Sequence, residues 1–174
     1  SMPILYVILA DRLGLKVAIA MAPSHLFVKA TDPATGRVFN LETTSGAHVT
    51  RDEWYREQLP MSDLAVEKGT YLRALTRRET VAVMAELLIE HYQQTGRPRA
   101  VIAAANEILG VFPDFADVLV ARASAQGRLL SEFQRKYASF EMIPPESRAE
   151  FQSLVAGNER DFARAHELGW QQPE

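Results

Sequence analysis

The sequence contains no cysteine among its 174 residues. Disulfides, thiolate zinc sites, iron–sulfur clusters and a thiol nucleophile are therefore excluded within this chain. The absence of cysteine does not indicate the cellular compartment, because a protein without cysteine is compatible with any redox environment.

A basic surface and a long apolar run are lacking as well. The formal net charge is -3, and the 24% of charged residues have mixed signs. This balance argues against nucleic-acid binding, which needs a concentrated basic surface, and against wholesale disorder. The apolar start at residues 3–10 is far shorter than the about 20 residues of a spanning helix, and no signal peptide is recognisable. We therefore expect a cytoplasmic protein with neither a nucleic-acid nor a membrane partner.

The first half of the sequence predicts a helix followed by antiparallel strands. Apolar residues recur at helical spacing over residues 2–13, and Gly14 stands where a helix C-cap is expected. Turn residues at 32–36 separate two strand patterns, which predicts a hairpin. The predicted strands cover residues 17–21, 25–30 and 37–42.

The second half of the sequence predicts helices alone. Its first helix start is marked by the capping box Thr76-Arg77-Arg78-Glu79, and a similar box, Thr50-Arg51-Asp52-Glu53, predicts a helix start before it, within the first half. The fold class is therefore α+β, with a small helix-plus-antiparallel-sheet domain at residues 1–75 and an all-α domain at residues 76–174. The predicted helices of the second domain cover residues 79–94, 98–110, 115–125, 129–140 and 146–168.

A candidate site surrounds the first histidine. His25 opens the second predicted strand, while Asn40 and Glu42 share one face of the third. The hairpin brings its far ends together, so a carboxylate or an amide is expected beside the imidazole, where it fixes the tautomer and stabilises the imidazolium. The competing interpretation, which spacing alone favours, is a strand-end histidine that is solvated or bonded to a backbone carbonyl.

Three phrases follow one another within residues 1–60: Leu9-Ala10-Asp11-Arg12-Leu13-Gly14-Leu15, Pro23-Ser24-His25-Leu26-Phe27-Val28-Lys29 and Asn40-Leu41-Glu42-Thr43-Thr44-Ser45-Gly46. This ordered combination resembles the bacterial transglutaminase-like proteins of the papain-like superfamily. The resemblance implies a papain-like fold, with His25 as general base, Glu42 as the orienting acid and Asn40 as the alternative orienter. Because the family more often has Asp at the acidic position, the longer Glu42 implies a hydrogen bond that is shifted or replaced by Asn40.

The resemblance also implies a thiol enzyme whose nucleophile is missing here. The family's cysteine stands at the amino end of the first helix, commonly two residues before the counterpart of Ser1, where helix N–H groups lower a thiol pKa. The hydroxyl of Ser1 is displaced along the helix start and is a poor substitute. We expect either a fragment of an enzyme for acyl transfer or amide and peptide hydrolysis, or a member that lost the thiol. The apolar opening also indicates truncation, and Ser1-Met2 is a vector remnant or native sequence.

The helical half contains a repeat-like pattern. The stretch from residue 89 to 113 resembles one tetratricopeptide repeat, at positions Ile89, Tyr92, Gly96, Ala105, Ile108 and Pro113. Such repeats often bind peptides in a groove, which makes a peptide or protein the expected partner. The competing interpretation, which we favour on fold grounds, is that these helices only complete the core. The apolar stripe of the 79–94 helix is predicted to consist of Val81, Met84, Leu88 and Tyr92.

Metal and cofactor sites have no support in the sequence. The histidines other than His25 lack any two-ligand spacing, so we expect neither a metal nor a cofactor. Trp54 and Tyr55 follow a polar loop, and they either wall a cleft beside His25 or pack onto the hairpin. The oligomeric state is left open by these patterns.

Overall fold

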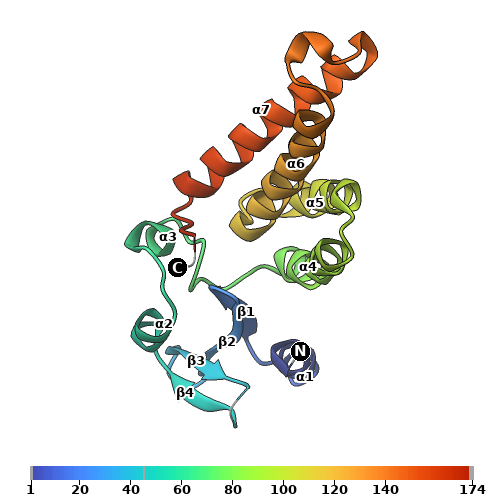
Figure 1. Cartoon of the computed structure of the whole chain (residues 1–174). Helices are drawn as coiled ribbons and strands as arrows, with labels where there is room; N and C mark the ends of the chain where they lie inside the picture. The colour runs from blue at the N-terminus through green and yellow to red at the C-terminus, as the bar shows by residue number, and fades with distance from the viewer. Residues whose placement is uncertain (1, 45, 173–174) are drawn as a thin grey trace. The chain divides into compact units, whose positions relative to one another are not determined.

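The computed structural model describes residues 2–44 and 46–172, which form a mixed structure of helices and strands (Figure 1). The strands pair in one antiparallel sheet of order β1-β2-β3-β4, so the α+β prediction is confirmed. The chain folds as two compact units, Ser1–Thr80 with Gly169–Glu174, and Val81–Leu168. No helix in the described parts of the chain is both long and apolar enough to cross a membrane.

The first unit contains the sheet. β2 and β3 form the predicted hairpin, with Lys29 opposite Asn40. The turn between them is closed by Asp32, whose carboxylate accepts hydrogen bonds from the backbone N–H of Ala34 and the hydroxyl of Thr35. These bonds are local, which explains why turn residues are sufficient to predict the hairpin. In chain order the elements are α1 (Met2–Arg12), β1 (Val17–Ala22), β2 (His25–Thr31), β3 (Val38–Glu42), β4 (His48–Thr50), α2 (Asp52–Gln58) and α3 (Asp63–Glu67).

Helix α1 ends as the sequence predicts. Gly14 has a φ of 69°, and the N–H of Leu15 donates to the carbonyl of Ala10 at 2.9 Å, so the glycine C-cap is confirmed. Pro3 and Ala10 are buried. The large apolar side chains of α1 are mostly exposed to solvent, among them Met2, Leu5, Ile8 and Leu9.

The predicted capping box at Thr50 is wrong. α2 begins at Asp52, and its N-cap residue is Arg51, whose side chain makes no capping bond. Thr50 is instead the last residue of β4, where it pairs with Asn40 of β3. Because the helix begins at Asp52, Arg51 and not Thr50 occupies the N-cap position. The short elements β4 and α3 are absent from the sequence prediction, because each is too short to show a hydrophobic period.

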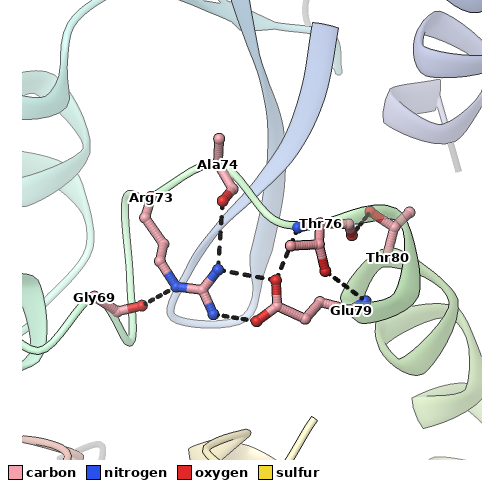
Figure 2. Close-up of polar contacts among 6 residues, drawn as sticks. All are labelled: Gly69, Arg73, Ala74, Thr76, Glu79 and Thr80. Atoms are coloured by element: carbon pink, nitrogen blue, oxygen red, sulfur yellow. Dashed lines mark hydrogen bonds and ion pairs between the residues drawn. The ribbon is translucent and has the colours of Figure 1, made fainter. Parts of the chain in front are cut away.

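The second predicted capping box is confirmed (Figure 2). The hydroxyl of Thr76 accepts from the N–H of Glu79 at 3.2 Å, and the Glu79 carboxylate accepts from the N–H of Thr76 at 2.8 Å. The same carboxylate binds the Arg73 guanidinium through two N–H groups, while Arg73 Nε donates to the carbonyl of Gly69. Hydrogen bonds from Arg73 are the main reason that the pKa of Glu79 is lowered to about 2. This cluster fixes the start of α4 (Arg77–Gln94).

The second unit consists of helices. Besides the remainder of α4, these are α5 (Pro98–Val111), α6 (Ala116–Lys136), the 3-10 turn η1 (Phe140–Met142) and α7 (Pro145–Glu167). The predicted helices at 98–110 and 146–168 are confirmed, but the separate helices at 115–125 and 129–140 are wrong, because α6 runs through both. Gly127 in its interior costs only about 1 kcal/mol. The burial of Ala125, Gln126 and Leu129 in this helix outweighs that cost.

The predicted apolar stripe of α4 is also wrong. Val81, Met84 and Leu88 are 64%, 43% and 51% exposed. The buried residues of α4 are instead Ala82, Val83 and Ile89. Both sets follow helical spacing, so periodicity alone does not decide between them. Exposed apolar side chains form a surface that we call the α4 face, made of Val81, Met84, Leu87 and Leu88.

Candidate functional site

The structure brings His25 and Glu42 into direct contact. The start of β2 lies beside the end of β3 in the antiparallel hairpin, and the two side chains meet with Nε2 and Oε2 at 2.6 Å. The carboxylate is almost completely buried, whereas a quarter of the His25 side chain remains exposed. The pair therefore combines a sequestered acid with an imidazole that solvent or a ligand can reach.

Both oxygens of Glu42 accept more than one hydrogen bond. Oε1 accepts from the backbone N–H and from the hydroxyl of Thr44. Oε2 accepts from His25 and, at 3.2 Å, from the hydroxyl of Tyr55. Thr44 thus folds the longer glutamate side chain back onto its own loop and presents the other oxygen to the imidazole. The extra methylene of Glu42 is accommodated without losing the bond to His25.

These donors determine the ionisation of Glu42. Burial alone would raise its pKa, but the hydrogen bonds from Thr44 and His25 outweigh burial and lower the pKa of Glu42 to about 2. The carboxylate is therefore ionised near neutral pH and only accepts hydrogen bonds. His25 must then donate through Nε2–H. Its other ring nitrogen, Nδ1, is left as the atom that can accept a proton in the neutral imidazole.

Tyr55 on α2 donates a hydrogen bond to the carboxylate of this pair. Its side chain is fully buried, and its ring stacks on Phe27 of β2 with centroids 3.9 Å apart. Burial is the main reason that the pKa of Tyr55 is raised, and the Glu42 charge adds to it, so its hydroxyl stays protonated and donates. The sequence left open whether Tyr55 walls a cleft beside His25 or packs onto the hairpin. In the structure it packs onto the hairpin. Trp54 is 38% exposed and stands edge-on to His48.

Asn40, the alternative orienter, belongs to another polar cluster. Its Nδ2 donates to Asp52 Oδ1 at 2.8 Å, and the same oxygen binds the ammonium of Lys29 at 2.6 Å. Lys29 and Asn40 are cross-strand neighbours, and Asp52 is the first residue of α2. The cluster therefore ties α2 to the hairpin that carries the dyad. Lys29 and Asp52 are missed by the sequence analysis, because nothing local predicts that α2 returns to this face.

A cavity of about 950 Å³ in the first unit lies apart from the dyad. Neither His25 nor Glu42 lines it. Apolar side chains such as Tyr6, Leu9 and Phe39 line it, and so do the polar residues Lys29, Asn40 and Asp52 of the cluster described above. Within residues 2–44 and 46–172, no cluster of three or more metal-ligating side chains occurs.

Two residues named in the sequence analysis, Ser1 and Ser45, lie outside the described residues. The expectation that the Ser1 hydroxyl is a poor nucleophile therefore stays a prediction. The loop phrase after the acidic strand is described up to Thr44 and again from Gly46.

No family model matches the sequence, and no curated protein or solved structure is significantly similar to it.

Proposed function

We propose that the first unit is a transglutaminase-like domain of the papain-like superfamily, in which His25 and Glu42 serve a thiol nucleophile. The reaction class is acyl transfer, or hydrolysis of an amide or peptide bond. One observation supports this proposal above others: a buried, ionised carboxylate holds Nε2 of His25 and leaves Nδ1 to accept a proton. A histidine that is merely solvated at a strand end does not need such an arrangement.

In this mechanism the imidazole acts first as base and then as acid. Nδ1 of His25 accepts the thiol proton, and the thiolate attacks the carbonyl carbon of the substrate. The imidazolium then returns its proton to the leaving amine, and the acyl group passes to water or to an amine. Glu42 stabilises the imidazolium through the 2.6 Å bond. The 174 residues contain no cysteine, so the thiol has to come from outside them.

The test uses a chain extended at its N-terminus so that a cysteine stands two residues ahead of Ser1. At pH 7 we expect iodoacetamide to alkylate this thiol about tenfold faster than the same thiol in the His25→Ala variant, because the imidazole favours the thiolate. His91→Ala is the matched control, since His91 is an exposed histidine of α4. Equal alkylation rates in all three chains would contradict the proposal.

A second candidate is a protein-binding module in which the tetratricopeptide-like helical region, residues 76–174, supplies the surface. The observation that favours it is the α4 face, whose four large apolar side chains are 43% to 68% exposed. Large exposed apolar patches mark interaction sites more often than a random surface does. A peptide or protein segment with apolar side chains at helical spacing is the expected partner.

Peptides selected from a displayed library against the chain separate the two functions. We expect the selected peptides to bind His25→Ala as they bind the unmodified chain, and to lose at least about tenfold in affinity toward a Leu87→Glu, Leu88→Glu double variant. Val49→Glu is the control, because Val49 is 65% exposed and lies on β4. Peptides that bind all variants equally would remove the α4 face from consideration.

A further inference from the structure

We propose that Tyr55 is a positioning residue for the dyad, holding Oε2 of Glu42 in line with Nε2 of His25. A catalytic role for Tyr55 rests on the proposed function. Its effect on the hydrogen bond between Glu42 and His25 can be measured without any nucleophile. Tyr55 comes from α2, outside the hairpin that supplies both members of the dyad. It therefore adds a constraint that the hairpin itself does not provide.

The need for this constraint follows from how Glu42 is held. The Thr44 bonds fix Oε1, but the carboxylate remains free to rotate about the axis through that oxygen unless the second oxygen is also fixed. The His25 ring is partly exposed, so packing restrains it less than it restrains a fully buried side chain. The Tyr55 hydroxyl reaches the same oxygen that His25 uses, at 3.2 Å. Two donors from different elements define the direction of Oε2.

Tyr55 is itself held rigidly. Its ring stacks on Phe27 of β2 with centroids 3.9 Å apart, and it lies edge-on to Trp54, its neighbour on α2, at 5.0 Å. The side chain has no exposed surface, so the hydroxyl has no access to bulk water as an alternative partner. Burial keeps the phenol protonated and the neighbouring carboxylate is ionised. The hydroxyl therefore donates to Glu42 rather than accepting.

The charged and titratable groups around the dyad come from three elements besides β2. β3 contributes Glu42, α2 contributes Tyr55 and Asp52, and β4 contributes His48, which pairs with Glu42 across the ladder. Asp52 acts on Tyr55 through its charge and raises the pKa of the phenol in the same sense as burial does. None of these groups reverses the direction of the Tyr55–Glu42 hydrogen bond.

The closing experiment is nuclear magnetic resonance of the unmodified chain and of Tyr55→Phe at neutral pH. In the unmodified chain we expect the Nε2–H proton of His25 to be visible and to show a nuclear Overhauser effect to the Tyr55 hydroxyl proton. In Tyr55→Phe, which keeps the stacked ring, we expect that Nε2–H proton to exchange with solvent at least about tenfold faster, the factor that matches the loss of one charge-assisted hydrogen bond. Trp54→Phe is the matched control, because Trp54 touches the Tyr55 ring and makes no bond to Glu42.

The outcomes distinguish this inference from the proposed function. Exchange that is equally fast in the unmodified chain and in Tyr55→Phe, or the absence of the hydroxyl contact in the unmodified chain, overturns the positioning role. Faster exchange in Tyr55→Phe, together with no His25 dependence of alkylation in the cysteine-extended chain, supports positioning and overturns the enzyme proposal. In an active extended chain, Tyr55→Phe should also lower the alkylation rate at pH 7. The control variant His91→Ala should be alkylated at the unchanged rate. An unchanged rate there would count against positioning for catalysis.

Discussion

Acid should destabilise the first unit through Glu42, and the size of the effect follows from its hydrogen bonds. The pKa of Glu42 falls from 4.5 to about 2 on folding, and about 1.36 kcal/mol per pKa unit converts this difference into about 3 kcal/mol. The folded pKa is the lower one, so this stabilisation is fully present above pH 4.5 and is lost as the pH falls toward 2. By pH 3 about 2 kcal/mol of it should be gone.

The assay is urea unfolding followed by tryptophan fluorescence between pH 7 and pH 3. Both tryptophans, Trp54 and Trp170, belong to the first unit, so their fluorescence reports that unit. Glu42→Gln should be less stable than the unmodified chain by about 3 kcal/mol at pH 7, because an amide nitrogen cannot accept the bonds that the carboxylate accepts. That difference should shrink toward pH 3, where Glu42 itself is losing its charge.

The controls separate Glu42 from other acidic groups. Glu79 also has a pKa of about 2 in the folded chain, but it is present in both proteins, so its contribution cancels in the difference between them. Glu57→Gln, at an exposed position of α2, should leave the pH dependence unchanged. Parallel stability curves for Glu42→Gln and the unmodified chain from pH 7 to pH 3 would refute the assignment of the buried, bonded carboxylate to Glu42.

Four further substitutions test other parts of the structure. Gly169→Ala should destabilise the first unit by more than about 2 kcal/mol in urea unfolding, because φ is 81° and a Cβ would lie 2.3 Å from the backbone nitrogen of Ala65. Gly36→Ala, with φ of 71° and open space around it, should cost only about 1 kcal/mol. Thr76→Ala should cost about 1 kcal/mol through loss of the helix cap, measured in the same way. Burial, together with the charges of Asp117 and Glu90, raises the pKa of Glu86 to about 8. Because the folded pKa is the higher one, the stability of the folded chain is lost as the pH rises from 4.5 to 8. Glu86→Gln should therefore raise the melting temperature more at pH 8 than at pH 5.

The parts of the structure that sequence predicts are those fixed by local rules. The hairpin follows from the turn residues around Asp32 between two strand patterns, and the meeting of its far ends places Glu42 beside His25. The C-cap at Gly14 and the capping box at Thr76 are likewise decided within a few residues. Local bonds of this kind do not depend on how the rest of the chain packs.

The parts that sequence does not predict depend on choices between equivalent patterns. α4 carries two apolar sets at helical spacing, and Ala82, Val83 and Ile89 are the ones that become buried. Thr50 satisfies the pattern of a helix cap as well as that of a strand end, and pairing with Asn40 decides for the strand. In each case a contact between segments distant in sequence settles the outcome, and single-sequence patterns carry no information about that contact.

The acidic position of the dyad shows the same limit in its chemistry. By residue type, Glu42 departs from the aspartate more common in the family that the sequence resembles, and Asn40 is the natural replacement as orienter. In the structure, Asn40 instead donates a hydrogen bond to Asp52. Thr44, two residues after Glu42, binds Oε1 and so accommodates the longer side chain of Glu42. What matters for His25 is the position of one carboxylate oxygen, and a loop threonine with a buried tyrosine fixes that position. The bond to His25 therefore depends on Thr44 and Tyr55 as well as on the acid itself.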